Sequence, residues 1–241
     1  MNNTEKLAQR GAKVVMNTYS RFPIAFDHGQ GVYVWDMDGK KYLDFVAGIA
    51  VNSLGYSHPK LCAKIAEQCQ KLMHVSNLYY TEPQITLAEE LCEHSCFDKV
   101  FFCNSGLEAN ECAIKIARKF GHAKGIEVPN IIVLKHAFHG RSIATLSATG
   151  NPSVREDFSP YTEGFIFVDE SDLDGIRKIV EENKNVVAIF FEPILGEGGV
   201  VPIDLSVIKG IREICDQYGA LFIIDEVMTG FRVSLAGAQA Y

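Results

Sequence analysis

Residues 221–231, with the sequence LFIIDEVMTGF, decide the fold class of this chain. Four apolar residues lead directly into two carboxylates, Asp225 and Glu226. An uninterrupted apolar run is typical of a strand that is covered on both faces. A carboxylate at the end of such a strand needs a partner, because an unpaired buried charge is costly. A single Asp at this place more often caps the next segment, so the question is which positive group the pair meets.

Four earlier apolar runs have the same character, and helical patterns separate most of them. The runs are KVFFC (99–103), NIIVL (130–134), GFIFV (164–168) and VVAIFF (186–191). Helices are expected over NECAIKIARKF (110–120), LDGIRKIVEEN (173–183) and DLSVIKGIREICDQYG (204–219). In the first helix Cys112, Ala113, Ile116, Ala117 and Phe120 form the predicted apolar stripe. Strands that alternate with helices predict an α/β fold with a mainly parallel central sheet and flanking helices.

The N-terminal part of the chain has a different pattern. Residues 31–48, GVYVWDMDGKKYLDFVAG, predict a β-hairpin with Asp38-Gly39 as its turn. We therefore expect residues 1–55 to form the N-terminal segment of a small α+β domain. Residues 56–241 are expected to form a large α/β domain.

Composition narrows the choice of partners. The chain has 241 residues, is 47% hydrophobic and carries a formal net charge of −7 without a basic block, which argues against nucleic acid and anionic membranes. No signal-peptide pattern and no transmembrane-length apolar stretch occurs, and seven cysteines suggest free thiols in the cytoplasm.

The cluster Cys92, His94 and Cys96 lacks a second ligand pair, so we predict no metal. No G-x-G-x-x-G opens a helix, which disfavours a nicotinamide dehydrogenase.

Chemistry-bearing residues follow several of the predicted strands. They are Asn104–Glu111 (NSGLEANE), Ala137–Ser142 (AFHGRS), Glu192–Gly199 (EPILGEGG) and the Asp225-Glu226 pair. A Ser-Gly turn at a helix start offers free N–H groups to a phosphate, although the same residues also make an ordinary turn. Phe138 could stack on a flat ring and Arg141 could bind a carboxylate, or they could be a buried Phe and a surface Arg.

The convergence of these residues favours a cofactor. In a parallel sheet, ligands bind beyond the carboxyl ends of the strands, so all four segments are expected at one edge. A phosphate cradle, a stacking aromatic ring and an acidic strand end together suit pyridoxal phosphate. By this hypothesis, Asp225 would meet the protonated nitrogen of the pyridine ring.

Several longer stretches resemble the class III, fold type I pyridoxal-phosphate aminotransferases, and among them the acetylornithine aminotransferases. The stretches are MNTYSRFPIAF, VWDMDGKKYLDFVAGIAVNSLGYSHP, HVSNLYYTEPQ, NSGLEANECAIKIARK, FHGRS, FEPILGEGG and LFIIDEV. The resemblance implies amino transfer from N-acetylornithine, or a related ω-amino acid, to 2-oxoglutarate in arginine biosynthesis. It also implies a homodimer.

The resemblance also implies roles for individual residues. Ser105, Gly106 and Leu107 would hold the phosphate of the cofactor. Phe138 and Val227 would pack on the two faces of its ring. Glu192 would line the ring pocket, and Asp225 would pair with the ring nitrogen. Arg141 would bind the substrate carboxylate, and Tyr19 would approach the substrate from the small domain. Glu197 matches the family's gate residue, which pairs with a distant arginine so that two different amino donors can use one site.

Two departures leave alternatives open. The tail MTGFRVSLAGAQAY is similar to glutamate-1-semialdehyde aminomutase. That family lacks an arginine at the place of Arg141 and lacks the Gly-Glu-Gly-Gly of 196–199. Other ω-aminotransferases, specific for ornithine or 4-aminobutyrate, are further alternatives.

The family's cofactor lysine is expected beyond Tyr241. No lysine in the chain stands in the family's Leu-Gly-Lys setting. The C-terminal part of the small domain is expected to be missing too. We therefore predict no catalytic lysine in these 241 residues and, as an alternative of another class, a catalytically inactive fragment.

Overall fold

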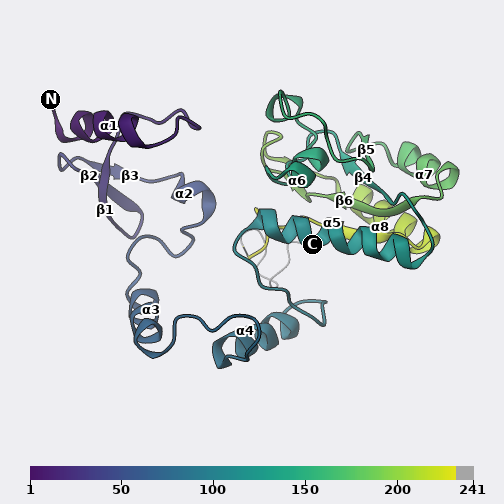
Figure 1. Ribbon diagram of the computed structural model, residues 1–241, viewed down its shortest axis with the longest axis horizontal. Coiled ribbons are helices and arrows are strands. Elements are labelled where there is room, and N and C mark those ends of the chain that lie inside the picture. The colour runs from purple at the N-terminus through teal and green to yellow at the C-terminus, as the bar shows by residue number, and fades with distance from the viewer. Residues whose placement is uncertain (232–241) are drawn as a thin grey trace. The chain divides into compact units, whose positions relative to one another are not determined.

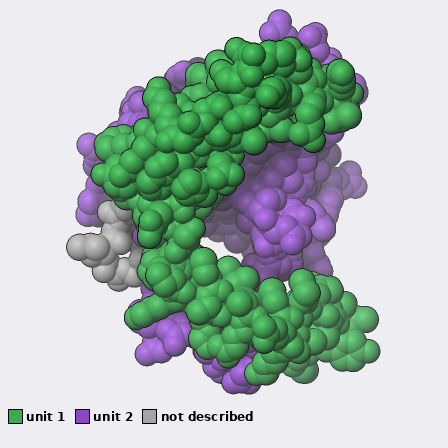
Figure 2. Space-filling view, turned by 90° about the vertical axis from the view of Figure 1, so that its left-hand side faces the viewer, with its two compact units in different colours: residues 1–81 green, residues 82–241 purple. Residues whose placement is uncertain are grey.

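A computed structural model describes residues 1–231 of the chain. The chain divides into two compact units, Met1–Thr81 and Glu82–Tyr241, coloured separately in Figure 2. The domain boundary expected at residue 55 stays a prediction.

The first unit contains three helices and a small antiparallel sheet. Its elements are α1 (Asn3–Val14), β1 (Phe26–Gln30), β2 (Tyr33–Asp36), β3 (Lys41–Leu43), α2 (Ala47–Ala50) and α3 (Pro59–Lys71). The sheet order is β1-β2-β3, and the predicted hairpin is confirmed as β2 and β3. Asp36 stabilises the turn because its carboxylate accepts from the backbone N–H groups of Asp38 and Lys40, at 3.0 and 2.8 Å.

The second unit contains the parallel sheet (Figure 1). Its elements are α4 (Glu82–Glu93), α5 (Gly106–Ala123), β4 (Asn130–Leu134), α6 (Ile143–Ala148), the 3₁₀ turn η1 (Pro152–Val154), β5 (Phe165–Val168), α7 (Leu173–Glu182), β6 (Val186–Phe191), β7 (Ile194–Leu195), β8 (Val201–Pro202), α8 (Leu205–Tyr218) and β9 (Leu221–Ile224). The sheet order is β5-β4-β6-β9, and its three pairings are all parallel. The predicted α/β fold with a parallel sheet is confirmed.

The sheet is covered by helices on both faces. Side chains alternate between the faces along each strand. On one face Ile132, Ile189 and Phe191 pack with α7 and α8. On the other, Ile131 and Phe190 belong to the cluster that contains the α5 side chains. Burial on both faces explains why β4 and β6 are continuous apolar runs.

One expectation about the second unit is wrong, and another is only partly right. Residues 99–103 form no strand, because no neighbouring strand among residues 1–231 pairs with them. The predicted stripe of α5 is right at Ala117, which is buried, and at Phe120, which packs against the core, but Ile116 is 56% exposed. The buried face of the helix also contains Asn110, Ile114 and Gly121. The helix carries apolar residues on two faces, so periodicity alone did not identify the face that meets the sheet.

Within residues 1–231, no helix combines the length and the apolar character needed to cross a bilayer.

Ile189 provides a test of the core. It is 0% exposed at the centre of β6, so Ile189→Ala should lower the free energy of unfolding by about 2–5 kcal/mol in urea denaturation. Ile116→Ala, the matched control on exposed α5 surface, should change it by less than about 1 kcal/mol. Equal losses in the two variants would contradict the assigned core.

Candidate functional site

The candidate site lies at the carboxyl ends of β4, β6 and β9. Since these strands are parallel neighbours, residues that follow them meet at one edge of the sheet. Phe138 lies in the loop after β4, Glu192 directly follows β6, and Asp225 directly follows β9. The backbone N–H of Asp225 still donates to the carbonyl of Phe191 at 2.8 Å, so the strand pairing itself fixes its position.

Asp225 is a buried carboxylate with hydrogen-bond donors from three segments. Its Oδ2 accepts from Asn110 Nδ2 at 2.7 Å and from His139 Nδ1 at 2.8 Å. Its Oδ1 accepts from the backbone N–H of Val227 at 3.0 Å. Hydrogen bonds to the charged form of a carboxylate stabilise that form, which offsets the cost of burial.

Asn110 and His139 are site residues that the sequence analysis did not assign. Both are buried, at 6% and 1% exposure. Each lies inside a motif that the analysis did quote, NSGLEANE and AFHGRS, so a signal was present. Their role was missed because sequence spacing does not show which side chain of a helix or loop turns toward Asp225.

The N-terminus of α5 provides free donors beside this carboxylate. Ser105 is the N-cap, and its Oγ accepts from the Glu108 N–H at 3.2 Å. Gly106 and Leu107 occupy the first helical turn, where backbone N–H groups have no intrahelical acceptor, and neither has an acceptor among residues 1–231. The helix dipole adds partial positive charge there. This end of α5 can therefore bind an anion.

Gly106 is in close contact with the segment that follows Asp225. A Cβ atom at Gly106 would lie 2.6 Å from both Cγ atoms of Val227. Only glycine allows this approach of the α5 N-terminus to the chain after β9. The structure thus brings Gly106, Val227 and Asp225 close together, and their roles toward a cofactor stay predictions.

Glu192 connects the loop after β4 to the loop after β6. Its Oε1 accepts from the Phe138 N–H at 2.7 Å, and its Oε2 accepts from the Gly196 N–H at 3.2 Å. Its residue is only 3% exposed. Burial raises the pKa of the Glu192 carboxyl above its usual range, the two backbone donors oppose the shift, and the charge of Asp225 adds to it.

The predicted substrate-binding residues are more exposed. Arg141 is exposed and lies with its guanidinium carbon 5.9 Å from the centre of the Phe138 ring. Glu197 is exposed in the loop after β7. Tyr19 is 63% exposed and belongs to the first unit, where it lines a groove of about 650 Å³ beside α1. The structure therefore joins Arg141 to the site but leaves Tyr19 and Glu197 as predictions.

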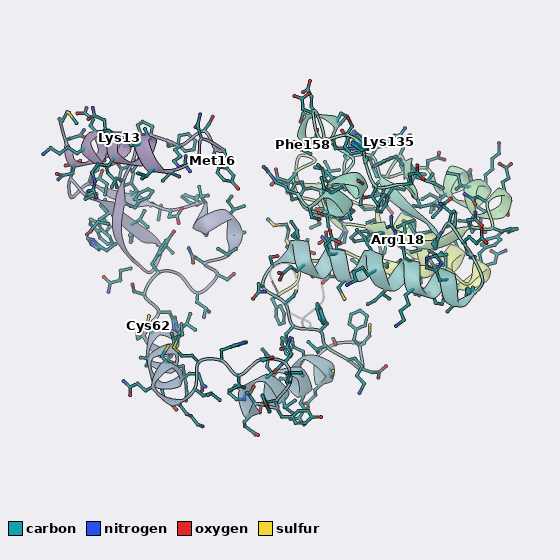
Figure 3. The ribbon with its side chains drawn as sticks, in the orientation of Figure 1. Lys13, Met16, Cys62, Arg118, Lys135 and Phe158 are labelled. Atoms are coloured by element: carbon teal, nitrogen blue, oxygen red, sulfur yellow. The ribbon has the colours of Figure 1, made fainter. Side chains whose placement is uncertain are left out.

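Lys135, labelled in Figure 3, is the lysine that directly follows β4. Its Nζ pairs with Asp169 Oδ2 at 2.8 Å, and this hydrogen bond raises the pKa of the ammonium group above its usual range. A lysine held in its charged form is a poor nucleophile. Lys135 is accordingly no substitute for a cofactor lysine.

A protein-family model described as aminotransferase class-III matches residues 14–238. The chain belongs to this family. The match covers both units, including the site segments of the second unit. The tail that is similar to the aminomutase lies mostly in residues 232–241, outside the described residues.

Curated relatives of this class-III aminotransferase chain carry one recurring name. Acetylornithine aminotransferase of Synechocystis sp. is 52% identical over 222 residues, which cover 90% of this chain and 52% of that protein. Acetylornithine aminotransferase of Nitrosomonas europaea is 47% identical over 216 residues, which cover 90% of this chain and 55% of that protein. The chain thus spans about half the length of the curated relatives it matches.

Solved structures in the family superpose well on the chain. Ornithine aminotransferase from Toxoplasma gondii has a TM-score of 0.90 at 30% identity, covering 95% of this chain and 55% of that one. N-acetylornithine aminotransferase from Stenotrophomonas maltophilia has a TM-score of 0.75 at 36% identity, covering 92% and 54%. A second Toxoplasma gondii structure, with a TM-score of 0.89, is described as having partial occupancy of PLP at its active site.

The contact between Gly106 and Val227 can be tested by substitution. Gly106→Ala should lower the free energy of unfolding by about 1–3 kcal/mol, because the added methyl group overpacks the contact. Adding Val227→Ala should recover part of this loss by removing both Cγ atoms. Gly11→Ala is the control, because Gly11 lies in α1 with open space around its Cα. Urea denaturation that shows no recovery in the double variant would contradict the contact.

Glu192 predicts a pH effect on stability. A carboxyl whose folded pKa is raised stabilises the protein below its unfolded pKa, and this contribution is lost as pH rises through the folded pKa. Because Glu192→Gln cannot ionise, its unfolding free energy should rise relative to that of the wild type as the pH increases above the usual carboxyl pKa of about 4.3. The control Glu213→Gln makes the same substitution on the exposed side of α8, away from the site. A flat difference for Glu192→Gln would disprove the burial effect.

Proposed function

We propose that this chain forms the cofactor-binding part of a pyridoxal-phosphate-dependent aminotransferase. The reaction is transfer of the terminal amino group of N-acetylornithine, or of a related ω-amino acid, to 2-oxoglutarate. The observation that carries the proposal is the buried Asp225 carboxylate, which lies beside the free N–H groups of the α5 N-terminus. A ligand that carries both an anionic group and a protonated ring nitrogen would match the positive end of α5 and the negative carboxylate of Asp225.

The residues fit pyridoxal phosphate. Ser105, Gly106 and Leu107 would hold the phosphate through N–H groups and the Ser105 hydroxyl. The close contact at Gly106 supports this, because any side chain there would displace Val227 from the cradle. Asp225 would hold the ring nitrogen in its protonated form.

Other residues would shape the ring pocket. Phe138 and Val227 would pack on opposite faces of the ring, and the position of Phe138 is fixed because Glu192 accepts its N–H. When bound, pyridoxal phosphate supplies a reactive aldehyde and a ring that withdraws electrons from the adjacent carbon. The chain's contribution is to orient that ring and to keep its nitrogen charged.

Arg141 would bind the carboxylate of the amino acid. A planar guanidinium can form two parallel hydrogen bonds to a carboxylate, and the position of Arg141 beside Phe138 supports this role. Glu197 would approach the substrate from the loop after β7, and the family resemblance assigns a substrate contact to Tyr19 as well.

Ornithine is the second candidate amino donor. The structural similarity to the Toxoplasma gondii ornithine aminotransferase favours it, whereas the higher sequence identity to acetylornithine aminotransferases favours N-acetylornithine. Homodimer formation and a cytoplasmic location are part of the proposal.

The function is tested with the natural protein that contains this sequence. Purified protein should show the absorbance of bound pyridoxal phosphate and should form glutamate from 2-oxoglutarate and N-acetylornithine. Ornithine, 4-aminobutyrate and glutamate semialdehyde serve as comparison substrates. Absence of both the absorbance and the transfer would overturn the proposal.

Arg141→Ala tests the carboxylate assignment. Loss of a charge-assisted pair should raise the KM for the amino donor about 10- to 100-fold, because such bonds contribute about 1.5–3 kcal/mol. Arg212→Ala on α8, whose guanidinium pairs with Asp216, is the control arginine and should leave KM unchanged. An unchanged KM in Arg141→Ala would refute this role.

A further inference from the structure

Asn110 and His139 hold the carboxylate on which the proposed function depends. We propose that they are positioning residues: they occupy Oδ2 of Asp225 and leave Oδ1 as the oxygen that accepts from the ring nitrogen of the cofactor. This inference rests on the proposed function and adds to it, because it assigns roles to two residues that no motif or comparison assigned.

The two oxygens of Asp225 differ in their hydrogen bonding. A carboxylate oxygen has about two lone-pair sites. Oδ2 receives two side-chain donors, Asn110 Nδ2 at 2.7 Å and His139 Nδ1 at 2.8 Å, so its sites are filled. Oδ1 receives the Val227 N–H at 3.0 Å, which leaves one site for a further donor. The ring nitrogen needs one acceptor, and Oδ1 has that capacity.

Asn110 fixes two segments at once. Its Nδ2 group donates to Asp225 and, at 2.8 Å, to the backbone carbonyl of His139. Both amide hydrogens are therefore used. Because Asn110 lies on the buried face of α5, the helix that also provides the phosphate cradle sets the position of Asp225. The ring-nitrogen partner and the phosphate donors are thus connected through one helix.

His139 is held rigidly. Its backbone N–H donates to Thr149 Oγ1 at 3.1 Å, and its ring stacks on Phe190 with centroids 3.8 Å apart and an interplanar angle of 18°. An ionised carboxylate only accepts hydrogen bonds, so Nδ1 carries the proton. Nε2 is buried without a partner among residues 1–231. The imidazole therefore serves as a single, fixed donor to Asp225.

Matched variants separate the donor from the bulk of each side chain. His139→Asn retains a donor near the position of Nδ1, whereas His139→Phe retains the ring stacked on Phe190 and removes the donor. Asn110→Leu keeps a similar volume and removes the amide. Circular-dichroism melting of each variant checks that it folds, and Thr149 is left unchanged so that the His139 backbone stays anchored.

The probes are pyridoxal phosphate and its 1-deaza analogue, which has a ring C–H in place of the nitrogen. Equilibrium binding of both to the full protein gives an affinity ratio that depends on the ring-nitrogen contact. His139→Phe and Asn110→Leu should lower the ratio about tenfold or more, and His139→Asn should retain most of it. The concentration of inorganic phosphate that displaces pyridoxal phosphate should be the same in the variants as in the wild type, because the N–H groups at the start of α5 remain.

Each outcome is decisive. A wild-type protein that binds neither probe would overturn the proposed function and this inference with it. If both His139→Phe and Asn110→Leu keep the wild-type preference for pyridoxal phosphate over the 1-deaza analogue, this inference is overturned and the proposed function is not. Equal weakening of both probes, or loss of fold in both variants, would also overturn it, because the residues would then be purely structural. A His139→Asn variant as defective as His139→Phe would rule out the donor role of His139.

Discussion

A single buried carboxylate, that of Asp225, connects the parts of the site. Its donors come from α5, from the loop after β4 and from the chain after β9. A charge of this kind is tolerated in an apolar interior only when donors surround it. If one donor segment moved, the charge would lose part of its compensation. The position of α5 against the sheet and the path of the β4 loop are therefore both tied to Asp225.

The layered arrangement makes this convergence possible. β4, β6 and β9 are parallel neighbours, so their carboxyl ends lie at the same edge of the sheet. The helices on both faces exclude water from the strands. Residues immediately beyond the strand ends consequently lie at the boundary between a dry core and an open edge, where charged groups have strong electrostatic effects.

The two buried acids of the site differ in their surroundings. Asp225 has two side-chain donors in addition to one backbone N–H, whereas Glu192 has two backbone N–H groups. Burial raises the pKa of Glu192. Glu192 holds the Phe138 backbone and the Gly196 turn, whereas in the proposed function Asp225 would provide the charge for a cationic ligand atom. Separate environments thus give two carboxylates separate tasks.

Local sequence patterns were enough to predict the parallel sheet and most of the residues at its carboxyl edge. The continuous apolar runs of β4, β6 and β9 require cover on both faces, and the polar residues after them mark the ligand-binding edge. Only the tertiary structure showed that residues 99–103 form no strand, because a strand exists through its neighbours and not through its own composition. Only the tertiary structure identified Asn110 and His139 as donors to Asp225, because the partners are 115 and 86 residues apart in sequence. Local patterns fix which faces are apolar, but contacts between distant segments depend on how the helices and strands pack.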